Sequence, residues 1–413
     1  MTDKSNPPAG ALRADLLILG GGLVGMTLAL AAARKGMTSH VVDHADPAEL
    51  TAEGFDGRAS AISTASWNLF SNIGLADALE PHGCPIDSIA VTDGMRPGRI
   101  DFTPDPHEGS LGRMFQNRVL RLALFDAASK EPRINWLAKA DVVARQRGEH
   151  GVSATLGDGT VLEASLLIGA EGRMSPTREE AGLAMAHWKY SHRAMIIGLT
   201  HSKPHDNVAW EIFYPAGPFA LLPLLDDEDG NHRSALVWTV AEKDAEGVLA
   251  LSRAAFRAEA AKRMHGVLGD IQLEGQLMSY PLSFQHTAKI VAERLALVGD
   301  AAHGMHPIAG QGLNLGLRDV GALIEVLAEG RRIGLDIGDA QLLARYEKWR
   351  ALDSLMVMSA TDGLTRLFGI PGKLPSAIRR LGMAAVQRTP ALKDFFMNEA
   401  RGMSGDLPEL LKG

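Results

Sequence analysis

The N-terminal part of the chain carries a strand, a glycine-rich turn and a helix in an order that few folds accommodate. The apolar run 15–19 is followed by three glycines that match the pattern Gly-x-Gly-x-x-Gly: Gly20, Gly22 and Gly25. The alanine-rich stretch 26–35 has helical composition, and a second apolar run, 40–42, ends at Asp43. Glycines at such a turn let the backbone approach a phosphate, and a carboxylate after the second strand suits a ribose hydroxyl. We therefore predict a βαβ unit that binds a dinucleotide.

A second glycine-rich stretch, residues 295–320, lies near the other end of the chain. Its apolar run 295–298 has the length of a buried parallel strand and stops at Gly299-Asp300. A glycine-rich loop follows, and then a helix that we predict from Leu313 to about Leu327. A carboxylate at a strand end suits ribose or ribityl hydroxyls, and glycines before a helix bring backbone N–H groups to an anion. This stretch predicts a site for an anion-forming ring cofactor.

Composition excludes several classes of protein. The 413 residues carry a net charge of −7, so no overall basic field recruits nucleic acid, and 46% hydrophobic residues can fill a large core. The single cysteine, Cys84, excludes an internal disulfide framework and a cysteine-based metal site. The first 13 residues are polar, and no run of about 20 apolar residues occurs, which argues against a secretory signal and a membrane span. We expect a cytoplasmic protein.

The middle of the chain shows a change of pattern. The glycine-rich loop 54–63 is expected to lead into a helix with Arg58 near its head, where this side chain could lie against a cofactor. Residues 111–129 have apolar positions at helical spacing. Between about 187 and 285, alternating apolar and polar residues predict an antiparallel sheet with four recognisable strands: 194–200, 208–214, 219–225 and 234–240.

Three motifs together resemble those of a known family. The first is the N-terminal glycine triplet with Asp43. The second is the run Gly169-Ala170-Glu171-Gly172 with Ser175 and Arg178. The third is the 295–320 stretch, whose characteristic residues are as follows: Gly299-Asp300, His303, Pro307, Gly310-Gln311-Gly312 and Asn314. With residues 57–63 upstream, they resemble the group A flavoprotein monooxygenases, and most specifically the aromatic-ring hydroxylases of ubiquinone biosynthesis, over nearly the whole chain.

The resemblance implies an α/β fold with a split Rossmann-like FAD-binding domain, an inserted antiparallel-sheet substrate domain and a C-terminal helical region. We place the FAD-binding domain at 13–186 and 286–360, the substrate domain at 187–285 and the helical region at 361–413. The implied reaction uses FAD, NADH or NADPH, and O₂. A flavin hydroperoxide would then hydroxylate the ring of a lipid-tailed substrate, a polyprenylated phenol.

The resemblance also assigns residues to the site. Those expected to bind the cofactor are Gly20, Gly22, Gly25, Asp43, Arg58, Glu171, Gly172, Gly299, Asp300, Gly310, Gln311, Gly312 and Asn314. Glu171 stands where the family usually has aspartate, so its contact is left open. Pro307 is expected where substrate meets flavin, as part of a dry wall. His303 is either a proton relay or a structural histidine, and we expect no metal site because His303 and His306 lack a third ligand.

The C-terminal segment carries its own charge pattern. Between residues 361 and 405, seven basic side chains stand against three acidic ones, with apolar residues interleaved. One interpretation is a helical cap on the FAD-binding domain. The other is a contact with an anionic membrane, on its inner face, or with a quinone-pathway complex, because the substrate's prenyl tail resides in the bilayer.

Two other functions share this scaffold and stay open at the level of sequence. One is an FAD-dependent isoprenoid reductase, which oxygen incorporation into the product would exclude. The other is a non-catalytic prenyl-binding chaperone that holds no flavin. The intact motif from Gly299 to Asn314 argues against the chaperone, because a flavin-free protein does not need it.

Overall fold

The first sheet of the structure contains the predicted βαβ unit. The structure is a computed structural model that describes residues 12–54, 57–94, 99–105, 107–304, 311–351, 353–354 and 388–413. Its core is a parallel arrangement in the order β18-β11-β1-β2-β8: β18 Leu295–Leu297, β11 Val161–Gly169, β1 Leu12–Leu19, β2 Ser39–Val42 and β8 Ile134–Leu137. β1 is the central strand, and its apolar residues 16–19 are buried, as the sequence predicts. The predicted Rossmann-like βαβ unit is confirmed.

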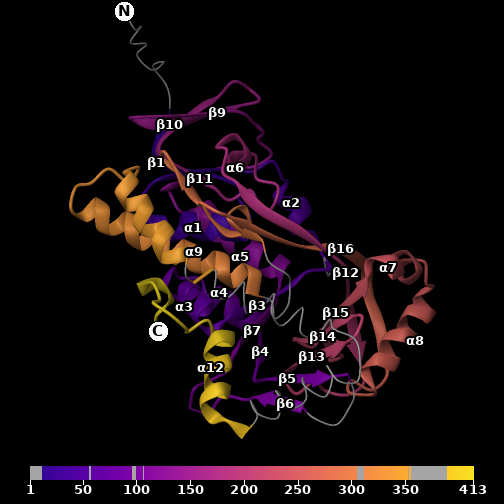
Figure 1. Cartoon of the computed structure of the whole chain (residues 1–413). Coiled ribbons are helices and arrows are strands. Elements are labelled where there is room, and N and C mark those ends of the chain that lie inside the picture. The colour runs from indigo at the N-terminus through magenta and orange to yellow at the C-terminus, as the bar shows by residue number, and fades with distance from the viewer. Residues whose placement is uncertain are drawn as a thin grey trace, which may run out of the picture.

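Short antiparallel strands extend this sheet, and helices cover it. The added strands are β9 Val142–Gly148, β10 Gly151–Leu156 and β17 Val291–Ala292. Three helices pack together over the sheet (Figure 1): α1 Leu23–Arg34, α5 Asn117–Lys130 and α9 Gln311–Arg332. The main hydrophobic core lies between these helices and the sheet. The helix predicted from Leu313 thus exists and is longer than expected.

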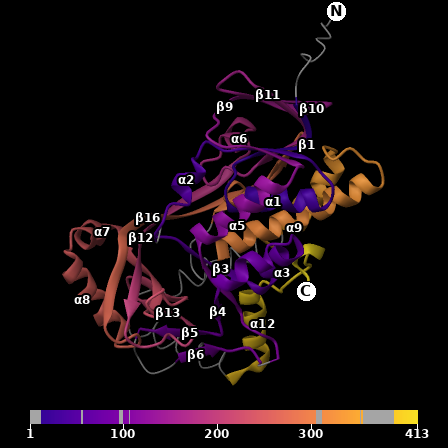
Figure 2. The same ribbon diagram turned by 180° about the vertical axis from the view of Figure 1, so that it is seen from behind.

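The second sheet is mainly antiparallel and has eight strands in the order β19-β16-β12-β15-β14-β13-β5-β6. Its strands are β5 Ser88–Asp93, β6 Arg99–Phe102, β12 Met185–His201, β13 Val208–Tyr214, β14 Gly217–Leu224, β15 His232–Ala241, β16 Ile271–Thr287 and β19 His303–Gly304. Two helices, α7 Glu242–Leu249 and α8 Arg253–Met264, cover one face with a separate apolar core. The long strands β12 and β16 run between the two lobes of the molecule (Figures 1 and 2).

The boundary predicted for the substrate domain needs a correction. β5 and β6 fall inside the segment 13–186, which we assigned to the FAD-binding domain, yet they belong to the second sheet. β5 pairs in parallel with β13, more than a hundred residues later in the chain. Pairing between such distant segments leaves no local pattern in the sequence. The second sheet was therefore expected to consist of residues 187–285 alone.

The structure also has a small third sheet, which shows that two further predictions are wrong. It consists of β3 Ala59–Ser63, β7 Gly112–Gln116 and β4 Cys84–Ile86. The predicted helix 111–129 is therefore a strand followed by α5, because the first residues pair with β3. Arg58 precedes strand β3, and the helix α3 Thr64–Asn72 begins only after it. The free Cys84 is buried in β4, and burial raises the pKa of its thiol to about 12.

The remaining described elements are short helices and the C-terminal segment. The short helices are α2 Pro47–Leu50, α4 Ala76–Leu79 and α6 Pro176–Glu180. α12, Pro390–Arg401, lies beside β6 in both views (Figures 1 and 2). Most of the predicted helical region 361–413 lies outside the described residues, and only 388–413 can be compared. None of the described helices is long and apolar enough to span a membrane.

Candidate functional site

The turn after β1 is built from glycines with different functions. Gly20 has φ +102°, and a Cβ on it would lie 2.4 Å from the Ala170 carbonyl oxygen. A Cβ on Gly25 would lie 1.9 Å from the Gly20 carbonyl oxygen, so the first turn of α1 packs directly on the loop. By contrast, a Cβ on Gly22 meets nothing within 4 Å. The first and third glycines hold the strand–helix crossing together, and the middle one leaves the turn open to a ligand.

The N-terminus of α1 fits a pyrophosphate. Gly22 is the N-cap, no side chain caps this helix end, and its first turn has no acidic residue. The N–H groups of that turn and the positive end of the helix dipole therefore face the open side of the loop.

Asp43 lies beside this turn, at the end of β2. Its Oδ2 accepts a hydrogen bond of 2.6 Å from the Gly21 N–H, and its Oδ1 accepts one of 2.8 Å from Ala45. These contacts orient the carboxylate against the glycine turn. A carboxylate has about four acceptor positions, so two remain for a ribose hydroxyl.

The second motif uses its carboxylate inside the protein. Glu171 accepts hydrogen bonds from the hydroxyls of Ser175, at 2.5 Å, and Thr177, at 2.8 Å, and pairs with Arg145 at 3.2 Å. These contacts fix the loop that begins α6. Gly172 has φ +77° and open space around its Cα. A contact between Glu171 and the cofactor stays a prediction, and Gly172 is the part of the motif that a ligand can approach.

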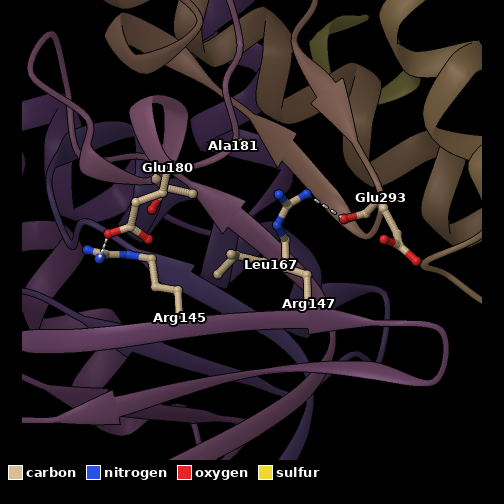
Figure 3. Close-up of a pocket in the computed structure, with 7 residues that line it drawn as sticks. Arg145, Arg147, Leu167, Glu180, Ala181 and Glu293 are labelled. Atoms are coloured by element: carbon tan, nitrogen blue, oxygen red, sulfur yellow. Dashed lines mark hydrogen bonds and ion pairs between the residues drawn. The ribbon is translucent and has the colours of Figure 1, made fainter.

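Figure 3 shows a recess behind this motif, lined by Arg145, Arg147, Leu167, Thr177, Glu180, Ala181 and Glu293. Arg145 pairs with Glu180 at 2.8 Å, in addition to Glu171. Arg147 donates to the Glu293 carbonyl oxygen at 2.9 Å. Both guanidinium groups are therefore engaged by the protein itself, and the recess has the character of a structural ion-pair cluster.

The third motif meets the first at Val24, in the first turn of α1. Gly299 has φ +61°, and a Cβ on it would lie 3.2 Å from the Val24 side chain. A Cβ on Gly316, in α9, would lie 2.9 Å from the same side chain. The two glycine-rich stretches, almost 300 residues apart, thus come together on one side of the sheet. They form the two halves of a single candidate cofactor site.

Asp300 has the exposure expected of a cofactor ligand. Its side chain is 40% exposed, and its Oδ2 lies 3.2 Å from the Arg173 Nε. Arg173 also donates to the Ser283 hydroxyl at 3.0 Å, which ties Asp300 to strand β16. The carboxylate keeps acceptor positions for the hydroxyls of a ribityl chain.

Asn314 and Arg58 connect the third motif to β3 and the second sheet. The Asn314 amide donates to the Ala61 carbonyl oxygen at 2.9 Å and accepts from the Ser63 N–H at 3.0 Å. Asn314 therefore holds β3 against the start of α9, and its contact with the cofactor stays a prediction. Arg58 donates from Nε to the Tyr280 hydroxyl at 3.2 Å, with its guanidinium 4.9 Å from that ring's centroid.

A cluster of buried charged side chains contacts Gly299 and His303 of the third motif. Most of its members were not predicted from the sequence. Asp319 is completely buried; its Oδ2 lies 2.9 Å from His303 Nε2 and accepts a 2.9 Å hydrogen bond from the Gly299 N–H. Its Oδ1 accepts a 2.6 Å hydrogen bond from Arg350, which also pairs with Asp353. Burial acts to raise the pKa of Asp319, but the charges of His303 and Arg350 outweigh it and hold that pKa below its usual value.

This cluster bears on the two interpretations of His303. The side chain is 1% exposed and pairs with Asp319, which favours a structural histidine that positions this carboxylate. A catalytic contact of His303 stays a prediction. An aspartate among the apolar residues of α9 was the signal in the sequence. Pro307, Gly310 and His306 lie outside the described residues, and Gln311 and Gly312 form the start of α9.

The family follows from the comparison of this chain with known proteins. Residues 13–360 match the family model of an FAD binding domain. The ubiquinone hydroxylase UbiL of Rhodospirillum rubrum is 44% identical over 97% of this chain and 93% of its own length. The chain belongs to the ubiquinone-biosynthesis hydroxylases, which are FAD-binding monooxygenases. A further member of this hydroxylase family, the 3-demethoxyubiquinol 3-hydroxylase of Escherichia coli, is 34% identical over 94% of this chain and 98% of its own.

Solved structures agree with this fold. The p-nitrophenol 4-monooxygenase PnpA of Pseudomonas putida has a TM-score of 0.77 at 18% identity, covering 95% of this chain and 99% of its own. PqsL of Pseudomonas aeruginosa has a TM-score of 0.74 at 23% identity, covering 91% and 100%. The predicted fold class, a split Rossmann-like domain with an inserted antiparallel sheet, is confirmed.

Proposed function

We propose that this hydroxylase adds an OH group to the aromatic ring of a polyprenylated phenol in ubiquinone biosynthesis, using NADH or NADPH and O₂. The observation that carries the proposal is the meeting of two glycine-rich halves at Val24, with Asn314 of the second half bonded to Ala61, which packs in an apolar cluster with the second sheet. The names of the relatives from R. rubrum and E. coli support the same reaction class. A lipid-tailed phenol is the substrate that suits such a face.

The residues present fit FAD. The open Gly22 turn and the uncapped N-terminus of α1 would hold the pyrophosphate, and Asp43 a ribose. Asp300 would bind the ribityl chain, and the start of α9 would direct N–H groups toward the ring. When bound, FAD supplies the redox chemistry: it takes a hydride from the nicotinamide and activates O₂ for transfer of one oxygen atom. The protein's own share is to bind, orient and exclude water.

The substrate wall is built from the second and third sheets. β3, held by Asn314, and β7 and β4 pack against β14 and its neighbours through small and apolar residues: Ala61, Met114, Ala209, Leu222 and Ala235. A Cβ on Gly57 would lie 2.5 Å from the Met278 side chain, so the Gly57–Arg58 turn also touches this wall. An apolar enclosure protects an oxygen-activating site from water.

Deletion of the gene in a quinone-producing host tests the pathway. We expect ubiquinone to fall and a polyprenylated intermediate lacking one hydroxyl to accumulate, as detected by mass spectrometry. A plasmid copy of the gene should restore ubiquinone. Normal ubiquinone with no accumulated intermediate, in a host without a second hydroxylase of this family, would contradict the assignment.

We further propose that α12 contacts the membrane that holds the substrate. Two large apolar side chains on it are exposed, Leu392 at 43% and Phe395 at 49%. Lys393 and Asp394 lie between them in the sequence, while Met397 packs inward against the apolar cluster of the second and third sheets. The helix has equal numbers of basic and acidic side chains, so we expect its apolar face to drive contact with the surface of the bilayer.

Vesicle flotation tests this contact. We expect the double variant Leu392→Glu/Phe395→Glu to float with phosphatidylglycerol vesicles about tenfold less than the unmodified protein, because charge on the apolar face opposes insertion. The control is Ile333→Glu, which changes an apolar residue that is even more exposed, at 65%, just after α9. Equal flotation of the double variant and the unmodified protein would exclude α12 as the contact.

A further inference from the structure

Glu211 is a carboxylate on the apolar face of the second sheet. In β13, side chains alternate between the two faces. Trp210 and Ile212 pack in the core that α8 covers, whereas Ala209 and Phe213 pack on the opposite face. Glu211 therefore points to the same side as Ala209 and Phe213, toward the proposed substrate wall.

The neighbours of Glu211 in the sheet are apolar. Ala220 of β14 and Val91 of β5 stand directly beside it in register, on the same face. Leu222 follows Ala220 on that face and packs against the third sheet. The face continues across β16 to Met278, which touches Gly57, and to Tyr280, which binds Arg58. Glu211 and the two residues that contact the Gly57–Arg58 turn thus share one face of the sheet.

No described residue compensates the charge of Glu211. Within the described part of the chain, its carboxylate has no hydrogen-bond donor and no cationic partner. Glu211 is partly buried, and the loss of solvation raises its pKa to about 7. A carboxylate in apolar surroundings costs stability when it is charged, so its presence here is better explained by chemistry than by packing.

We propose that Glu211 is a catalytic residue that binds the ring hydroxyl of the phenol and accepts its proton. This inference rests on the proposed function, because it assumes a phenolic substrate. In the step, the substrate O–H bond breaks, the proton moves to a Glu211 carboxylate oxygen, and the electron pair stays on the substrate oxygen. The resulting phenolate ring is more electron-rich and therefore reacts faster with an electrophilic oxygen donor. Solvent takes the proton from Glu211 after product leaves.

Other titratable groups on this face are placed differently. Asp93 lies on β5 beside Phe213, about 7–8 Å from Glu211 by the diagonal spacing of a sheet, and is buried. Arg58 and Tyr280 bind each other near the cofactor motif. His192 lies three strands away, on β12. Glu211 is the acid–base group that stands among apolar neighbours in the middle of the wall.

The test is the pH profile of hydroxylation by Glu211→Gln, with a short-chain polyprenylphenol as substrate. For the unmodified enzyme we expect the rate to rise as Glu211 ionises, around pH 7. For Glu211→Gln we expect a rate lower by about 100-fold at pH 7.5, the usual effect of losing a general base. The variant should recover toward pH 10, where the phenol ionises without help. A ring-fluorinated, more acidic phenol should restore the rate at lower pH.

Control variants and readouts separate this role from a structural one. Glu228→Gln removes the same charge from an exposed turn and should leave the profile unchanged. Glu211→Gln should keep its bound flavin and its flavin spectrum. If the unmodified enzyme hydroxylates the phenol and Glu211→Gln matches it at every pH, the proton-acceptor role is wrong and the proposed function stands. If the unmodified enzyme forms no hydroxylated product, the proposed function itself fails.

The same substitution has an expected effect on stability, which checks the burial of Glu211 without any substrate. The pKa of Glu211 is raised from 4.5 to about 7 in the folded protein, so the folded state favours the protonated form. The unmodified protein should therefore lose stability as the pH rises from about 4.5 to 7. Glu211→Gln should lack this loss and melt at a higher temperature than the unmodified protein above pH 7. If the difference in melting temperature between Glu211→Gln and the unmodified protein stays the same from pH 4.5 to 7, the Glu211 carboxylate is well solvated and its pKa is not raised.

Discussion

Replacing Asp319 with alanine should destabilise the protein by about 3–5 kcal/mol, the usual effect of removing one partner from a buried ion pair. Asp319 and Arg350 are both almost completely inaccessible, and His303 is 1% exposed. Without the Asp319 carboxylate, the guanidinium of Arg350 keeps Asp353 as its one acidic partner among the described residues, and the Gly299 N–H loses its acceptor. Unfolding in urea, followed by circular dichroism, measures the loss.

The matched control for Asp319 lies on the same helix. Glu329→Ala removes an exposed carboxylate that pairs with Arg345, and exposed pairs contribute at most about 1 kcal/mol. The depressed pKa of Asp319 makes the effect depend on pH: the stabilisation is present above the unfolded value of 3.8 and is lost as the pH falls through the folded pKa. If Asp319→Ala and Glu329→Ala cost the same at neutral pH, the cluster does not support the site.

Replacing Gly25 with alanine should cost the protein most of its flavin. A Cβ there would lie 1.9 Å from the Gly20 carbonyl oxygen, so α1 must move away from the turn that would hold the pyrophosphate. Overpacking of this kind typically costs about 1–3 kcal/mol. If the whole of that cost falls on the conformation that binds FAD, the affinity for FAD should drop by about 5- to 150-fold. Absorbance at the flavin band of the purified protein, and titration with FAD, measure the loss.

Gly247→Ala is the control for the glycine substitution. Gly247 lies inside helix α7, and a Cβ on it would meet nothing within 4 Å. Alanine there should leave FAD binding unchanged and stabilise the helix by about 0.5–1 kcal/mol. Full flavin content in Gly25→Ala would mean that the turn does not bind the pyrophosphate.

Elements with a strong local pattern could be predicted from the sequence. β1, the glycine turn and α1 follow one another within two dozen residues, and each step has its own signature. The strand at Leu295 and the helix after it were predicted for the same reason. The strands of the second sheet between 187 and 285 alternate clearly enough to be recognised.

Contacts between distant segments could not be predicted. β5 belongs to the second sheet only because it pairs with β13, and nothing within residues 88–93 specifies that partner. Glu171 and Asn314 also make contacts with the segments around α6 and β3 that their motifs did not reveal, because a motif does not show which way a side chain points. The ion pairs of Asp319 with His303 and Arg350 join residues that are distant in the sequence, so they could be recognised only in the structure. Glu211 lies in a predicted strand, but the alternating pattern did not show which face of the sheet is directed to the proposed substrate site.

The central claim is that this chain places one oxygen atom from O₂ on the ring of a polyprenylated phenol. The most direct measurement is mass spectrometry of the product formed by the purified, FAD-loaded protein with a short-chain polyprenylphenol, NADH or NADPH, and ¹⁸O₂. We predict a product with one additional hydroxyl that carries the ¹⁸O label, and an unlabelled hydroxyl when ¹⁶O₂ is used in ¹⁸O-labelled water. A product that gains two hydrogens and no oxygen would identify an isoprenoid reductase. An unchanged phenol, with no flavin retained by the protein, would identify a prenyl-binding chaperone, and either result would contradict the hydroxylase.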